Sequence, residues 1–228
     1  MKNYFYIIIG SFLLFLACNN EAKENTRNTS TINIDTFNAA DEALAKELKA
    51  QAFNSRIDFD HVESLFTYKN IKQINDSNSF SSSKFNRLSA DEYYAAFQDT
   101  SEYIYEPEFN GAYYYSDQGE WNGLRRYIFV KLNEDCCTYY YYNIYDKTGK
   151  LIDSFIIEGH GGDGGWGINM NGTILNDSTV TRTAVECESE EGSENNIEVC
   201  DSIITLFKIL PTGKLNETQI FKATSTKK

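Results

Sequence analysis

A glycine-rich segment, EGHGGDGGWG at residues 158–167, holds the side chains best suited to acid–base chemistry. His160 and Asp163 could form an acid–base pair of the kind that a hydrolase uses. The segment lacks the lysine and the serine or threonine of a phosphate-binding loop, and no nucleophile motif accompanies it. We therefore favour a flexible surface connection between strands, with Trp166 as its one anchor, packed against the sheet. The hydrolase remains the alternative.

A tyrosine run, TYYYYNIY at residues 138–145, is the second candidate surface. In a strand, Tyr139 and Tyr141 face one way, whereas Tyr140 and Tyr142 face the other. One face must join the core. The other is either an exposed aromatic strip that binds a glycan or a protein, or a surface covered by helices, which we favour because large exposed apolar patches are rare. The candidate ligand-binding residues are Tyr139, Tyr141, His160, Asp163 and Trp166.

Four cysteines follow the N-terminal region, and two of them suit a disulfide. Cys187 and Cys200 flank an acidic loop at the ends of two expected hairpin strands, so we predict that they are bonded. Cys136 and Cys137 are adjacent, and in a strand they point to opposite faces, so they would bond each other only in a strained ring. We leave their pairing open. Cysteines without a spacer are poorly arranged for a metal, and we expect neither a metal nor another cofactor.

The N-terminus reads as an export leader. Lys2 precedes an almost wholly apolar run, residues 4–17, which is shorter than the roughly 20 residues that a membrane-spanning helix needs. A charged start, a short apolar stretch and a small final residue are typical of a secretory signal peptide, which we place at residues 1–17. Residues 18–35 are rich in Asn, Thr and Glu without apolar periodicity, and we interpret them as a flexible tether.

The sequence FLAC, which ends at Cys18, resembles the lipobox of bacterial lipoproteins. Ala17 and Cys18 fit that pattern, whereas Phe15 stands where Leu is usual and Leu16 where a small residue is usual. The resemblance covers residues 1–18 only. It implies that the leader is cut before Cys18, that Cys18 receives lipid, and that the protein is exported and anchored in the outer membrane of a Gram-negative bacterium.

The remaining sequence predicts an α+β fold that is mainly β. Within residues 36–100 we expect short helices: one with an apolar stripe from Phe37 to Leu48, one beginning near Asp60, and one with capping-box spacing at Ser89 and Glu92. Residues 101–224 predict an antiparallel β-meander that forms a barrel or a sandwich. The segments expected to be strands are 125–133, 137–146, 150–159, 178–188 and 201–210. Gly149 and the pair Asn171-Gly172 are expected in hairpin turns.

The amino-acid composition limits the classes of function that are expected. The formal net charge of −12 argues against a nucleic-acid partner, because phosphates need clustered Lys and Arg. Two classes remain: a non-enzymatic, lipid-anchored envelope protein that binds a glycan or another protein, and a hydrolase that uses His160 and Asp163. A pocket with converging polar groups at the glycine-rich segment favours the hydrolase, and an exposed tyrosine strip favours the binding protein.

Overall fold

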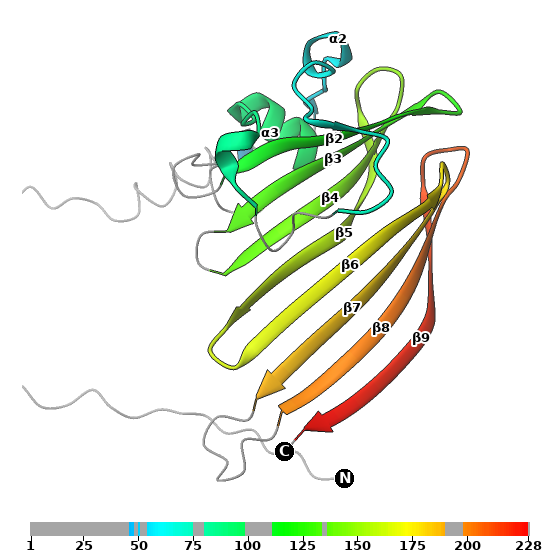
Figure 1. Cartoon of the computed structure of the whole chain (residues 1–228). Coiled ribbons are helices and arrows are strands. Elements are labelled where there is room, and N and C mark those ends of the chain that lie inside the picture. The colour runs from blue at the N-terminus through cyan, green and yellow to red at the C-terminus, as the bar shows by residue number, and fades with distance from the viewer. Residues whose placement is uncertain are drawn as a thin grey trace, which may run out of the picture.

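The computed structural model describes residues 46–47, 50, 54–74, 80–98, 111–133, 136–189 and 198–227. Short helical elements come first along the chain, and long strands follow (Figure 1). The elements are α2 (Phe59–Val62), β1 (Tyr68–Lys69), the 3₁₀ turn η2 (Ser82–Lys84), α3 (Ala90–Phe97), β2 (Ala112–Trp121), β3 (Leu124–Asn133), β4 (Cys137–Tyr145), β5 (Leu151–Asp163), β6 (Trp166–Asn176), β7 (Thr179–Ser189), β8 (Glu198–Ile209) and β9 (Leu215–Lys227).

The strands of the described residues form one sheet in the order of the chain, from β1 to β9. Strands β2 to β9 pair antiparallel with their neighbours, whereas β1 pairs parallel with β2. The prediction of a mainly β fold, with short helices before an antiparallel meander, is therefore confirmed. The sheet curves strongly but is not closed into a barrel, and it is one continuous sheet (Figure 1).

Two of the expected helices are present where the capping residues place them. The Ser89 hydroxyl accepts the backbone N–H of Glu92, and the Glu92 carboxylate accepts the N–H of Ser89 at 2.7 Å, so the capping box of α3 is complete. The short helix α2 begins after Asp58, whose side chain caps it. The helix expected from Phe37 to Leu48 lies largely outside the described residues.

The strand pattern was informative where side chains are apolar and failed where they are small or polar. The five expected segments correspond to β3, β4, β5, β7 and β8. Strands β2, β6 and β9 were not singled out. Polar residues interrupt β2, Gly and Asn supply five of the eleven residues of β6, and most of β9 is exposed, so none shows a clear alternation.

The sequence TGKL occurs at residues 148–151 and again at 212–215, and both copies belong to matching hairpin turns. Gly149 and Gly213 adopt φ angles of +79° and +84°, which favour glycine. Gly149 donates its N–H to the carbonyl of Asp146, and Gly213 donates to Leu210, at 3.0 and 2.8 Å. The expected turn at Gly149 is thus confirmed.

The hairpin expected at Asn171-Gly172 is wrong, because both residues lie inside β6, between its ends. Strands β5 and β6 separate beside this glycine: their ladder ends at the pair Gly159–Met170, and a register shift in β5 follows. A side chain at position 172 would collide with the backbone and side chain of Ile157. Gly172 therefore permits a close approach of the β6 backbone to Ile157 of β5, and it does not form a turn.

Hydrophobic side chains pack on both faces of β2–β4. One cluster lies under the helices and includes Phe66, Tyr114, Tyr127, Phe129 and Tyr145. The other cluster lies on the opposite face. It joins β2–β5 to the halves of β6–β8 that lie next to the β6–β7 and β8–β9 turns, which we call the far halves. Its members include Tyr142, Phe155, Ile174, Val180 and Phe207. The rings of Phe155 and Phe207 stack with their centroids 4.2 Å apart, so the sheet bends enough to bring β5 and β8 together.

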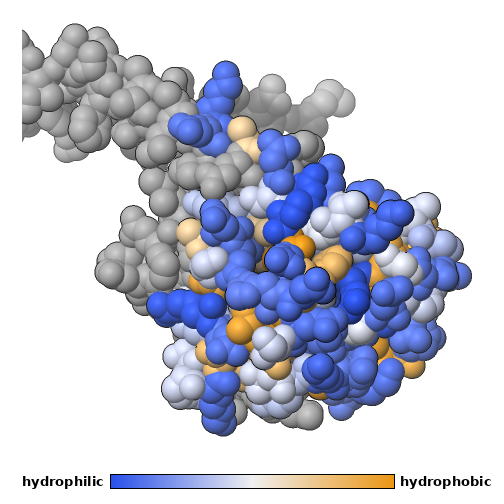
Figure 2. Space-filling view, turned by 90° about the horizontal axis from the view of Figure 1, so that it is seen from above, coloured by the Kyte–Doolittle hydropathy of each residue, from blue (hydrophilic) through white to orange (hydrophobic). Residues whose placement is uncertain are grey.

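Seen from above, the described surface is mostly hydrophilic, and the hydrophobic areas are small and scattered (Figure 2). Among the described residues, no helix has the length and apolar character needed to cross a membrane.

The close contact of Gly172 with Ile157 leads to a testable prediction. Gly172→Ala should lower the free energy of unfolding by about 1–3 kcal/mol, because the new methyl group has no space beside Ile157. Urea unfolding followed by circular dichroism would measure the change. Gly167→Ala is the matched control on the same strand, since its nearest atom would be the Gly161 carbonyl oxygen at 3.9 Å. Equal stability of the two variants would contradict the close contact between Gly172 and Ile157.

Candidate functional site

The face of the sheet that α3 covers continues beyond the helix onto β5–β9. Tyr141 lies at the border, because its ring contacts Phe97 of α3 with centroids 5.1 Å apart. Directly paired residues of neighbouring strands share a face, so the register extends this face in rows. The first row is Tyr139, Gly159, Met170, Ala184 and Ile203; the second is Cys137, Gly161, Ile168, Glu186 and Asp201; the third is Asp163, Trp166, Glu188 and Val199.

Glycines in β5 shape this face because they have no side chains. An ideal Cβ at Gly159 would lie 2.6 Å from a ring carbon of Tyr139, and one at Gly161 would collide with Cys137. The side chains of β4 therefore lie over the backbone of β5. The Met170 side chain meets Tyr139 above Gly159 from the other direction, since its methyl group is 3.3 Å from the same Cβ position. The glycines thus allow Tyr139 to extend across the sheet.

Two aromatic residues and one carboxylate form what we call the aromatic–acidic strip: Tyr139, Trp166 and Glu186. The indole Nε1 of Trp166 donates to Oε1 of Glu186 at 2.7 Å, across β6 and β7. Burial, and secondly the negative charge of Glu186, raise the pKa of the Tyr139 phenol. Both rings are half-buried. The strip therefore presents two ring surfaces with a carboxylate that one ring holds in place.

A small acidic pocket adjoins the strip. It has a volume of about 170 Å³ and is lined by Glu186, Glu188, Val199 and Asp201. Hydrogen bonds from Thr224 and Lys222 lower the pKa of Asp201, which keeps its carboxylate ionised. The pocket thus adds negative charge and hydrogen-bond acceptors beside the rings.

The structure separates His160 from the other candidate residues. His160 pairs with Thr138 and Asn169, so it lies on the face opposite Tyr139. Its Nδ1 is buried without a hydrogen-bond partner among the described residues. Asp163 is three residues further along β5, at the exposed end of the strand, and points to the other face. The described geometry therefore does not bring the proposed acid–base pair together.

The glycine-rich segment is mostly strand and not a flexible connection. Residues up to Asp163 belong to β5 and those from Trp166 to β6, which leaves Gly164 and Gly165 as a tight turn with φ angles of +51° and +98°. The glycines at 159 and 161 serve close side-chain packing, which their sequence alone does not distinguish from flexibility. Trp166 begins β6 and is half-buried, and its indole is bound to Glu186.

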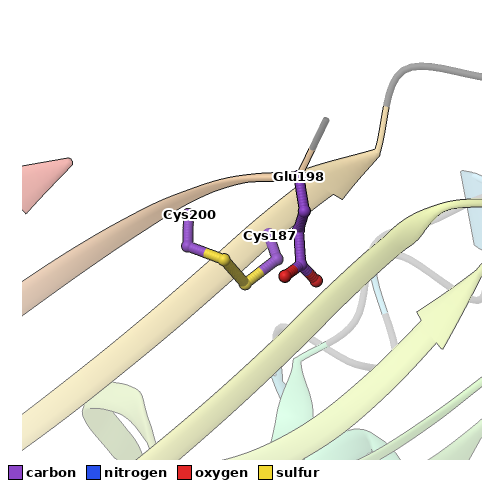
Figure 3. Close-up of side chains that lie close together, drawn as sticks. All are labelled: Cys187, Glu198 and Cys200. Atoms are coloured by element: carbon purple, nitrogen blue, oxygen red, sulfur yellow. A yellow bond between two sulfur atoms is a disulfide. The ribbon is translucent and has the colours of Figure 1, made fainter. Parts of the chain in front are cut away.

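Both cysteine pairs are disulfides. Cys187 and Cys200 lie directly opposite each other on β7 and β8, as predicted (Figure 3). Glu198 lies beside them, and its carboxylate and the two sulfurs are within 4.8 Å of one another. The sulfurs are bonded to each other, so neither provides the thiolate that a metal requires.

Cys136 and Cys137 are also bonded to each other. Cys136 stands in a turn just before β4, where its N–H donates to the carbonyl of Asn133. The alternation expected of two residues within a strand therefore does not apply to this pair.

Sequence analysis missed the carboxylates of the site. Glu186 and Glu188 alternate with Cys187 inside a segment that was correctly predicted as a strand, so they had to share one face. That alternation was the available signal. Their proximity to Tyr139 and Trp166 depends on the order of β4 to β7, which no local pattern reveals.

No family model, curated protein or solved structure matches this chain. The function is therefore argued from the geometry of the strip.

The strip predicts a specific electrostatic coupling. Glu186→Gln should lower the pKa of the Tyr139 phenol, because a nearby negative charge disfavours the phenolate, and the pKa should stay above its ordinary value because the burial remains. A pH titration of the Tyr139 ring carbon signal by NMR, assigned with Tyr139→Phe, measures it. Glu188→Gln is the matched control and should leave the pKa unchanged. An unaltered titration in Glu186→Gln would contradict the arrangement.

Proposed function

We propose that this chain is a lipid-anchored envelope protein that binds carbohydrate on the aromatic–acidic strip. The observation that carries the proposal is the hydrogen bond of Trp166 to Glu186 on the same sheet face as Tyr139. Tyrosine and tryptophan rings combine a large apolar surface with a polar edge, which suits the C–H faces and hydroxyl groups of a sugar. An ionised carboxylate accepts hydrogen bonds from those hydroxyls.

The charge of the surface restricts the class of carbohydrate. Glu186, Glu188 and Asp201 line the adjoining pocket, and Asp163 ends the row that contains Trp166. Like charges in and around a binding site oppose an anionic ligand. The proposed ligand is therefore a neutral or amino-bearing glycan, and not a carboxylated or sulfated one.

Anchoring is the second part of the proposal. The apolar run that ends in Ala17-Cys18 supports a lipidated N-terminus, and the polar residues 19–35 support a tether between lipid and domain. The multiple acyl chains that the lipobox resemblance implies would hold the protein at a membrane, whereas a single chain gives only reversible binding. On this proposal the strip faces glycans of the cell envelope.

Carbohydrate binding is tested with the two rings. Calorimetric titration of the full-length protein with neutral, amino-bearing and carboxylated oligosaccharides should show binding to members of the first two groups. Tyr139→Ala and Trp166→Ala should each raise the observed Kd about tenfold or more, which is the usual effect of truncating a central aromatic contact. Tyr141→Phe is the matched control, since its ring contacts α3. Binding that survives both alanine variants, or is absent from the whole panel, would contradict the proposal.

Anchoring is tested separately through Cys18. Cys18→Ala should move the protein from the membrane fraction to the soluble fraction, because the acceptor of the lipid is gone. The far-ultraviolet circular dichroism spectrum should be unchanged. Mass spectrometry of the mature wild-type protein should find lipid on an N-terminal Cys18. An unmodified N-terminus at another residue would overturn the assignment of the leader.

A further inference from the structure

The two edges of the sheet differ in whether other described segments pair with them. Strand β1 covers part of β2, and residues 86–88 pair with another part: Leu88 donates its N–H to Ala112, and Tyr114 donates to Asn86, at 2.9 and 3.0 Å. At the other end, β9 pairs with β8 along its length. None of the described segments pairs with the outer edge of β9.

The open edge is long and partly apolar. Strand β9 is 13 residues long, and nearly all its side chains are exposed. Ile220 and Phe221 are adjacent at its centre and are 56% and 49% exposed. Natural proteins usually cover, charge or pair such an edge, because its free N–H and C=O groups are a template for another strand.

An irregularity at Ile220 changes which charges share a face. Phe221 pairs with Ile204 and Gln219 pairs with Thr205, so Ile220 is an additional residue in β9. Glu217 and Lys222 are five residues apart and would point to opposite faces in a regular strand. Their partners on β8, Phe207 and Ile203, are four residues apart, which places Glu217 and Lys222 on the same face.

We propose that β9 pairs antiparallel with β9 of a second copy of this chain. A two-fold axis between Gln219 and Ile220 places Glu217 opposite Lys222 of the second copy, and the symmetry repeats the contact. Opposite charges in direct cross-strand positions stabilise a strand pair, and the shared face makes this register possible. Lys222 also lies 3.0 Å from Asp201 of its own chain, so it would bridge two carboxylates. A second copy is therefore complementary to this edge.

Charge reversal tests the pairing. Sedimentation velocity of the full-length protein, in micelles matched to the solvent density and in excess over protein, should show a concentration-dependent dimer. Glu217→Lys alone and Lys222→Glu alone should each weaken dimerisation about tenfold or more, because two like-charge pairs replace two attractive ones. An equal mixture of the two variants should recover the dimer, since the heterodimer restores both opposite-charge pairs.

Lys147→Glu, in the exposed turn between β4 and β5, is the matched charge reversal and should leave the dimer intact. Circular dichroism would establish that each variant is folded. A wild-type chain that remains monomeric overturns the proposal. Dimers that persist in both single variants, or a mixture that fails to recover them, overturn the β9 register and indicate another contact.

Discussion

The separation of β5 and β6 beside the close contact of Gly172 with Ile157 allows the sheet to bend. Where the two strands separate, their ladder hydrogen bonds are lost, and buried backbone groups need other partners. The buried Glu158 carboxylate accepts the N–H of Gly172 at 3.0 Å, and the carbonyl of Lys72 accepts the N–H of Ile174 at 2.8 Å. A side chain and a short N-terminal segment thus replace the neighbouring strand, and the far halves of β6–β8 can turn onto the core.

The turned half is held by polar contacts made at the hairpin ends. The Arg126 guanidinium, which is 3% exposed, donates to the carbonyls of Gln118 and Asp177 and so joins the β2–β3 hairpin to the β6–β7 turn. Lys214 donates to the carbonyl of Ile152 and the N–H of Leu215 donates to Asp153, which joins the β8–β9 turn to β5. The buried Arg126 charge would be strongly destabilising without its acceptors. Its contacts therefore fix the β2–β3 hairpin against the β6–β7 turn.

The sequence predicted those features that depend on local physics. Ser89 and Glu92 specify a helix start through bonds between neighbours, and the acidic loop between two strand segments places Cys187 opposite Cys200. Gly172 was misinterpreted because a glycine gives the same local signal whether it permits a turn or a close approach of Ile157. Trp166 and Tyr139 were identified as candidates, but Glu186 was missed, because the bond to Trp166 forms only when β6 and β7 pair. The site is therefore less predictable than the fold.

The part of β6–β9 that lies away from the β6–β7 and β8–β9 turns has few buried side chains of its own. The outer parts of β6–β9 form a single layer in which most side chains are exposed or half-buried, and Met170 and Cys200 are among the few buried ones. The Cys187–Cys200 bond lies in this layer, where the loop-closure model assigns a bridge across 13 residues about 3 kcal/mol. Covalent cross-linking here compensates for missing burial. The disulfide thus stabilises a layer in which Tyr139 and Trp166 can stay half-exposed, as a binding surface requires.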